Sequence, residues 1–92
     1  MEDHPIDIAA GILGSQTALA DTLGVSKGAV HQWKDPERKV PSEHCGPIER
    51  ATDGRVTCEQ LRPDLQWARI PDRAWPWHKR GRPVLDVTKQ AA

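Results

Sequence analysis

Apolar residues recur with a helical period through the first half of the chain. From Ile6 to Leu13 they return at spacings of three and four residues, which predicts an amphipathic helix over residues 5–13. Pro5 is tolerated in a first turn, where its missing N–H would have no helical partner. Gly14 follows the last apolar position and ends the predicted helix.

The next stretch predicts two short helices joined by a tight turn. They cover residues 16–23 and 27–34, and Ser15 and Ser26 stand where a side-chain oxygen can cap each helix. Gly24 lies where the chain must reverse, and glycine adopts a positive φ there at little cost. This geometry allows the second of these helices to lie in the major groove of DNA.

The second of these helices has two different faces. Val30 and Trp33 are three residues apart, so they share a face that can pack against Leu19, Ala20 and Leu23. The opposite face is left free to meet a partner, and it carries Lys27, Gly28, His31, Gln32 and Lys34.

A polar loop over residues 35–39 precedes a fourth predicted helix. This helix opens at Pro41 or Ser42 and ends near Thr52. Pro47 falls well inside it and removes one backbone hydrogen bond, so we expect a helix that starts late or is bent there.

The character of the chain changes after one more short helix. Residues 57–60 have the spacing of a capping box, which predicts a single-turn helix. From about residue 66 tryptophan and proline replace the helical period, and residues 67–70 and 84–87 are predicted as short strands. The predicted fold is therefore all-α, a compact bundle of about five short helices with a Trp- and Pro-rich C-terminal extension.

We divide the chain into a DNA-binding domain at residues 1–65 and an extension at 66–92 that covers the core or serves dimerisation.

Composition limits how the chain can be stabilised. Of the 92 residues, 37% are hydrophobic and 28% are charged, so the core is modest. Two cysteines, Cys45 and Cys58, are too few for a disulfide framework. A partner subunit is the expected remedy.

The hydropathy of the chain predicts a cytoplasmic protein. No segment approaches the roughly 20 apolar residues of a membrane span, and no secretion signal is recognisable, so we expect a cytoplasmic location and no membrane partner.

The formal net charge is zero, but acidic residues dominate positions 1–21 and cations gather over 27–39. A second group of cations comprises Arg69, Arg73, Lys79, Arg80 and Arg82. This clustering favours one basic face that can contact phosphates, against the alternative of a chain balanced only for solubility.

Several short strings within residues 1–65 carry a family resemblance. They lie at 14–20, 23–26, 40–41, 48–52, 56–57 and 61–65, together with the pair Val30 and Trp33. In these strings the chain resembles the Cro-like helix-turn-helix repressors of phages and prophages, and most of all the YdaS-type group of antitoxins or Cro-like regulators. The resemblance implies a lambda-repressor-like bundle that binds an operator, usually as a homodimer. In some Cro-like proteins a C-terminal strand pairs across the dimer, and the tail at 66–92 is compatible with that role.

DNA binding of this type divides into positioning on the phosphates and reading of the bases. For positioning, Gln16 and Thr17 lie at the exposed start of a helix, where backbone N–H groups favour a phosphate. Lys34, Arg38 and Lys39 are candidates for the phosphates that flank the groove.

For reading, Gln32 can bond N6 and N7 of adenine together, and Lys27 can reach O6 and N7 of guanine. His31 can donate to a base acceptor or to a phosphate. Gly28 and Ala29 allow a close approach, and Ala29 can touch a thymine methyl group. The candidate DNA-binding residues are therefore Gln16, Thr17, Ser26, Lys27, Gly28, Ala29, His31, Gln32, Lys34, Arg38 and Lys39.

Other chemistry finds little support in the sequence. His44, Cys45 and Cys58 do not have the paired spacing of a structural zinc site, so neither a metal nor a cofactor is expected. Gly-rich phosphate loops and nucleophile motifs are missing, so we expect no enzyme. The serious alternative to a DNA-binding regulator is an antitoxin-type protein-interaction module, with the Trp-rich tail as the segment that binds another protein.

Overall fold

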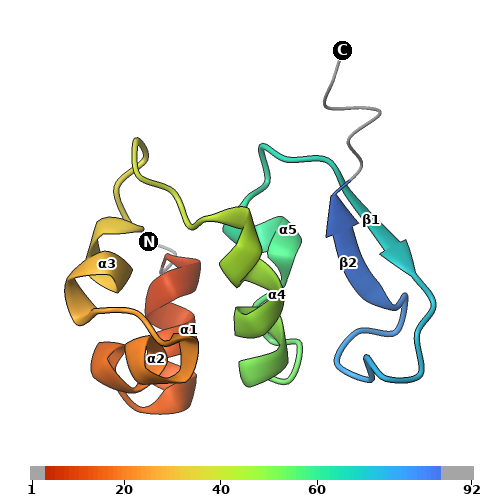
Figure 1. The fold of residues 1–92 in the computed structure, drawn as a ribbon, viewed down its shortest axis with the longest axis horizontal. Helices are drawn as coiled ribbons and strands as arrows, with labels where there is room; N and C mark the ends of the chain where they lie inside the picture. Colours follow the sequence, from red (N-terminus) through yellow and green to blue (C-terminus); the bar gives the residue numbers. More distant parts are fainter. Residues whose placement is uncertain (1–3, 86–92) are drawn as a thin grey trace.

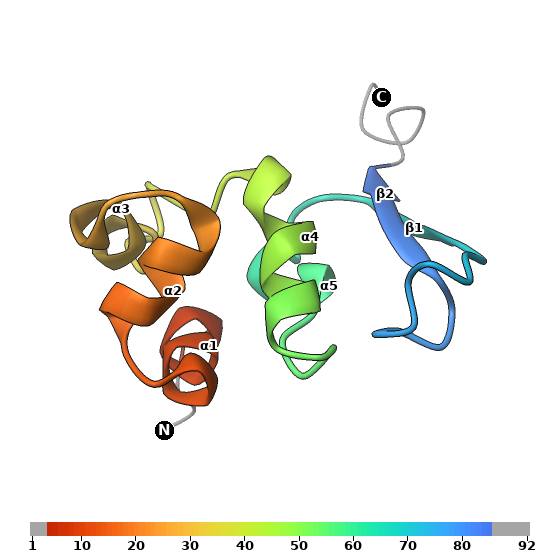
Figure 2. The ribbon, with the colours of Figure 1, turned by 60° about the horizontal axis from the view of Figure 1, so that its bottom comes forward.

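Helices and a short sheet follow one another across the molecule in three groups. The computed structural model describes residues 4–85. Its elements are α1 (Pro5–Leu13), α2 (Gln16–Leu23), α3 (Lys27–Gln32), α4 (Ser42–Ala51), α5 (Cys58–Leu61), β1 (Trp67–Ile70) and β2 (Arg82–Leu85). The first three helices lie together at one side, α4 and α5 lie in the middle, and the two strands lie at the other side (Figure 1). The same order is seen after rotation (Figure 2), so the predicted helical bundle with a stranded extension is confirmed.

The predicted caps form at the helix-turn-helix. Ser15 Oγ accepts a hydrogen bond from the backbone N–H of Ala18 at 3.0 Å, and Ser26 Oγ accepts one from Ala29 at 3.1 Å. Gly24 takes the left-handed conformation with φ +72°, which lets the chain reverse between α2 and α3. Local sequence therefore determines both ends of this turn, with a Ser→Ala cap loss costing roughly 1 kcal/mol.

Two further caps fix α1 and α5. Thr57 and Gln60 exchange side-chain and backbone hydrogen bonds in the predicted capping box. The cap of α1 was not predicted. Nδ1 of the His4 ring accepts a hydrogen bond from the backbone N–H of Ile6 at 3.1 Å. The ring nitrogen there takes the place of the hydroxyl or carboxylate that usually serves this purpose.

The end of α3 differs from the prediction, whereas α4 has the predicted boundaries. The helix expected over 27–34 ends at Gln32, because Pro36 disfavours helical conformation in the residue before it and the chain tightens into turns. The fourth helix does not start late: it begins at Ser42 and runs through Pro47. Pro41 precedes it with φ −57°, close to a helical value, and Ile48 is fully buried, so packing holds the helix despite the lost bond.

One hydrophobic core joins the helices. Its buried members are Ile6, Ala9, Ala10, Leu19, Ala20, Val30, Trp33, Val40, Cys45, Ile48, Val56, Cys58 and Leu61. Trp33 is 7% exposed, and its ring lies 5.2 Å from the ring of His44 on α4. Each large side chain buried in this way contributes about 1.5–3 kcal/mol. The predicted core position of Trp33 is confirmed, and it anchors α3 to the rest of the bundle.

The C-terminal extension forms an antiparallel hairpin. Trp67 of β1 is paired with Leu85 of β2, and Ile70 is paired with Arg82. The first strand lies where it was predicted, but the second begins at Arg82 rather than at residue 84, since a two-stranded sheet tolerates Pro83 on an edge. The remaining predicted strand residues, 86 and 87, lie outside the described residues.

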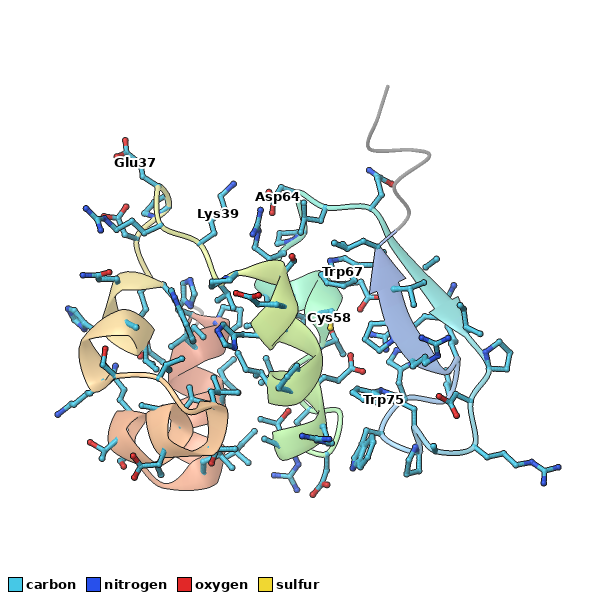
Figure 3. All side chains as sticks on the ribbon, viewed as in Figure 1. Glu37, Lys39, Cys58, Asp64, Trp67 and Trp75 are labelled. Carbon is cyan, nitrogen blue, oxygen red and sulfur yellow. The ribbon has the colours of Figure 1, made fainter. Side chains whose placement is uncertain are left out.

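A buried carboxylate fastens this hairpin to α4. Glu49 has no exposed surface, and it accepts hydrogen bonds from Arg69 Nη1 at 2.7 Å, Arg69 Nη2 at 2.5 Å and Trp75 Nε1 at 2.7 Å. The backbone N–H of Cys58 adds a fourth at 3.3 Å, and Arg69 also donates to Glu59. Burial alone would raise the pKa of Glu49, but the bonds from Arg69 and Trp75 outweigh it and hold the pKa below its usual value. Trp67 and Trp75 lie between the hairpin and the helices (Figure 3).

The burial of Arg69 corrects the prediction that the second group of cations forms part of a basic face. The side chain of Arg69 is 2% exposed, so it belongs to the interior and not to a basic face. Arg82 Nε lies 3.5 Å from a carboxylate oxygen of Asp72. The exposed cations that remain on the hairpin loop are Arg73, Lys79 and Arg80.

The turn after α4 leaves no room for a side chain. Gly54 has φ +79°, and a Cβ atom there would lie 1.9 Å from the backbone oxygen of Trp77. We expect Gly54→Ala to lower the free energy of unfolding by about 2–3 kcal/mol, since it adds left-handed strain to a backbone clash. Chemical denaturation would measure the loss, with Gly11→Ala as the control. A Cβ at Gly11 in α1 meets nothing within 4 Å, so that change should be neutral or stabilising. Equal losses in the two variants would contradict the close docking of the hairpin.

Candidate nucleic-acid interface

Helix α3 presents polar groups to solvent while its other face is buried. Lys27, Gly28, His31 and Gln32 are exposed, and Val30 has no exposed surface. The helix is short and polar on its outer side, and it is held from behind by the core. Ala29, which was predicted to touch a thymine methyl group, is half-buried and packs against the core. The accessible face of α3 is therefore made by the other four residues, and a groove of matching width can receive it.

Helix α2 carries two further residues predicted to contact DNA. Helices α2 and α3 pack against each other through the buried Leu19, Ala20 and Val30. Thr17 is exposed and Gln16 is half-buried, and the hydroxyl of Ser15 is occupied by the backbone of Ala18. Helix α2, which carries these two predicted phosphate-binding side chains, is thus a direct neighbour of α3.

Both of the lysines predicted to bind phosphates have internal partners. Lys34 Nζ lies 3.2 Å from a carboxylate oxygen of Asp7 on α1. Lys39 Nζ lies 3.5 Å from Asp64, just after α5, and Figure 3 shows the two side chains above the helices. These pairs are substantially exposed, so each is weak and can exchange for a phosphate. Arg38 is exposed, and no ion pair is recorded for it among residues 4–85.

Sequence reasoning missed the residues that hold the loop after α3. Arg62 donates from Nε and Nη2 to the two carboxylate oxygens of Asp64, at 2.9 Å each. Its Nη1 donates to the backbone oxygen of Val40 at 2.9 Å, which ties the end of this loop to α5. The signal was available in the string Leu-Arg-Pro-Asp at 61–64, because a carboxylate two residues after an arginine can accept a bidentate pair.

Other kinds of site find no support in the described residues. Within residues 4–85, no group of three His, Cys, Asp or Glu side chains could hold a metal ion. Cys45 and Cys58 are buried free thiols, and burial raises the pKa of Cys45 to about 12, which leaves its thiol protonated and unreactive. Across the same residues, none of the helices has the length and apolar character that crossing a membrane requires.

Comparison with known proteins identifies relatives for most of the chain. Residues 6–70 match the family described as bacterial toxin YdaS. The chain is 46% identical over 67 residues to the "Putative transcriptional regulator YdaS" of Escherichia coli K12, covering 73% of this chain and 68% of that protein.

Solved structures give the same picture. The Cro protein from a prophage element, Xfaso 1, of Xylella fastidiosa strain Ann-1 is 47% identical, with a TM-score of 0.64. The match covers 72% of this chain and all of that one. XPH1, a hybrid sequence of Xfaso 1 and Pfl 6, is 50% identical over 67% of this chain and 94% of its own, with a TM-score of 0.52. Residues beyond 70 lie outside the family match, so the whole hairpin loop and β2 lie past it.

Proposed function

The chain belongs to the YdaS family of Cro-like proteins, and from this premise we propose that it is a DNA-binding transcriptional regulator that reads the major groove with α3. The observation that carries the proposal is the division of α3 into two faces. Lys27, His31 and Gln32 face solvent, while Val30 and Trp33 are locked into the core. A helix fixed in this way can present its polar groups without further ordering when it meets DNA.

Each outer side chain has a role in this proposal. Gln32 bonds N6 and N7 of adenine, and Lys27 bonds O6 and N7 of guanine. His31 donates to a base or a phosphate, and Gly28 and Ala29 let the backbone approach the base edges. Ser26 keeps the first turn of α3 ordered through its bond to Ala29.

Positioning on the DNA backbone comes from both sides of α3. Gln16 and Thr17 bind a phosphate at the start of α2, where the helix dipole favours negative charge. Lys34, Arg38 and Lys39 bind phosphates near the end of α3, with Lys34 and Lys39 released from their carboxylate partners. These contacts set the register, and the side chains of α3 read the sequence.

We propose further that the protein binds as a homodimer on an approximate palindrome. Two copies would place their α3 helices about 34–36 Å apart, one turn of DNA. The two-stranded sheet supports this proposal, because β1 and β2 pair only with each other among the described residues and each keeps an edge that can accept a further strand. The modest apolar content of the chain favours added burial between copies.

The proposal is tested by binding to the DNA upstream of the gene that encodes this chain. We expect a fragment of that DNA to be bound about a thousandfold or more tightly than a scrambled duplex of equal composition. Gel shift or fluorescence anisotropy would measure the ratio, and analytical ultracentrifugation of the complex should find two chains per palindrome. Equal binding to the two duplexes at all salt concentrations would overturn a sequence-specific regulator.

The second candidate is a protein-interaction module of a toxin–antitoxin kind. The description of the matching family as a toxin favours it, as does the Trp-containing hairpin that extends beyond the family match. Trp75 and Trp67 weigh against the hairpin as a binding segment, since both donate indole hydrogen bonds into the protein itself. Loss of selective DNA binding in the experiment above would make this candidate the better one.

A further inference from the structure

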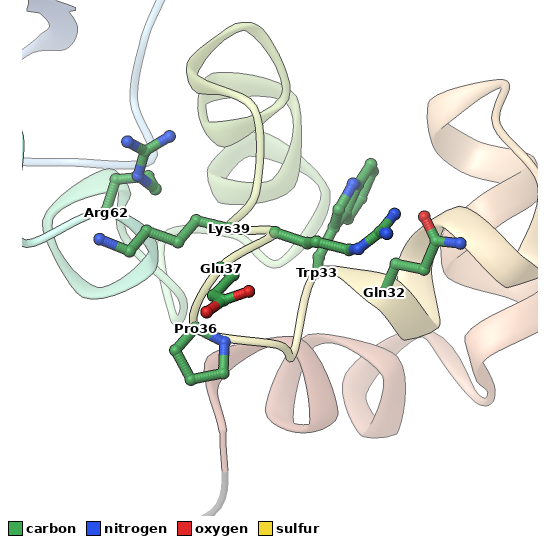
Figure 4. A pocket seen from close by; sticks show the side chains of 7 residues that line it. Gln32, Trp33, Pro36, Glu37, Lys39 and Arg62 are labelled. Carbon is green, nitrogen blue, oxygen red and sulfur yellow. The ribbon is translucent and has the colours of Figure 1, made fainter.

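An open depression lies beside the end of α3. It encloses about 530 Å³ and is lined by residues of α3, of the loop that follows and of Arg62 (Figure 4). Its charged lining comprises Arg38, Lys39, Arg62 and one carboxylate, Glu37, and Gln32 borders it. A depression with this excess of cations, next to a residue proposed to read a base, suits a single anion.

Arg62 gives the depression a fixed wall. Three of its five N–H groups are used, one toward Val40 and two toward Asp64, and the side chain is only 18% exposed. The loop that carries Arg38 and Lys39 is therefore tied to α5 where it joins Val40. The hydrogen bonds from Arg62 hold the pKa of Asp64 far below its usual value, so Asp64 is a carboxylate at neutral pH.

Asp64 also holds Lys39 through the pair at 3.5 Å. The contacts with Arg62 and Lys39 differ in strength, because the arginine pair is bidentate and partly shielded while the lysine pair is exposed. An incoming anion can therefore take Lys39 from Asp64 and leave the Arg62–Asp64 pair in place.

We propose that this depression binds one phosphodiester group of DNA, which displaces Asp64 from Lys39 while Arg62 and Asp64 keep the loop in position. The inference rests on the proposed function. It gives Arg62 and Asp64, which lie outside the helix-turn-helix, a part in DNA binding. Asp64 acts as a built-in competitor of the phosphate. Its charge lowers the affinity for all DNA, so that sequence-selective contacts from α3 decide where the protein stays.

The first test is the salt dependence of binding to the duplex selected from the upstream DNA. Binding weakens as salt rises, so the slope of log K against log salt is negative. Lys39→Gln should reduce the magnitude of this slope by about 0.9, the value for one phosphate contact. Lys79→Gln is the matched control, because Lys79 is an exposed lysine on the hairpin loop and its loss changes the net charge equally. That control should keep the wild-type slope.

The second test removes the competitor. Asp64→Asn should bind both the selected and the scrambled duplex about two- to fivefold more tightly at low salt. Combining it with Lys39→Gln should remove most of this gain. Thermal unfolding of each variant would show that the fold is intact, and the Lys39 and Lys79 pair decides the matter if Asp64→Asn does not fold.

The outcomes distinguish failure of the phosphate site from failure of the proposed function. Wild-type protein that selects the upstream duplex, with unchanged slope in Lys39→Gln, would overturn the phosphate site and leave the proposed function standing. A folded Asp64→Asn that binds no more tightly than wild type would overturn the competitor role. Wild-type protein that selects no duplex would overturn the regulator and the phosphate site together.

Discussion

Replacing Glu49 with glutamine is expected to lower the free energy of unfolding by about 3 kcal/mol. The Arg69 guanidinium would then keep only the partly exposed Glu59 as a carboxylate partner, and the NH2 group of the glutamine amide would face a guanidinium donor at one of the 2.5–2.7 Å contacts. Urea denaturation would measure the loss. The melting temperature should fall by about 4–8 °C for each kcal/mol in a domain of this size.

The control for this prediction is Glu59→Gln. Glu59 also accepts two hydrogen bonds from Arg69, but its side chain is 42% exposed, so its removal should cost under about 1 kcal/mol. Equal losses in the two variants would show that burial of Glu49 does not set the strength of this contact. The pair would then be a surface feature and not the fastening of the hairpin.

The pH dependence of stability gives the same prediction a second readout. The pKa of Glu49 is lowered in the folded protein, so its stabilisation is complete above its ordinary value of 4.5 and is lost as the pH falls through the lower folded value. Glu59 and Asp64 shift in the same direction but are present in both proteins. The difference between wild type and Glu49→Gln should therefore shrink below pH 4.5, and a difference that stays constant with pH would contradict the charge as its cause.

This fastening affects how the extension can be studied. Deleting residues 66–92 removes Arg69 and Trp75 together, which takes from Glu49 both of its side-chain donors. A truncated chain would lose stability whether or not the strands serve dimerisation. Tests of self-association should therefore keep the hairpin, and change only outward-facing groups on its edges.

The elements that could be predicted from sequence are those whose causes are local. Ser15, Ser26 and Thr57 each cap the helix that follows, and Gly24 reverses the chain between α2 and α3. Each depends on residues within a few positions, so pattern and residue type are enough. The expected strand start failed at Pro83, because a proline suggests a turn unless the partner strand is known.

The contacts that sequence could not predict join distant positions. Glu49 and Arg69 are 20 residues apart, and Asp7 and Lys34 are 27 apart, with no spacing that marks them as partners. Clustering along the sequence placed Arg69 on a basic face, whereas folding brings two carboxylates to it. The outward face of α3 was predictable because the spacing of apolar residues along the sequence indicates which side of a helix is buried.

Replacing Lys27, His31 and Gln32 together with alanine is expected to lower the ratio of selected to scrambled DNA binding at least about 30-fold. Two bidentate base contacts at about 1–3 kcal/mol each account for this loss. Alanine has the highest helix propensity, and all three side chains are exposed, so α3 should keep its fold behind the cap of Ser26. Anisotropy titrations on both duplexes would give the ratio, with circular dichroism to confirm helix content.

The decisive comparison is with a variant that loses more charge elsewhere. Changing Arg73, Lys79 and Arg80 on the hairpin loop to alanine removes three cations, against one permanent cation in the α3 variant. If α3 reads base edges, the hairpin variant keeps its selectivity, because phosphate contacts carry no sequence information. If binding were only electrostatic, the hairpin variant would be the weaker binder and neither protein would differ from wild type in selectivity. The two triple variants therefore distinguish base reading by the outer face of α3 from purely electrostatic attraction to DNA, because only base reading makes selectivity depend on Lys27, His31 and Gln32.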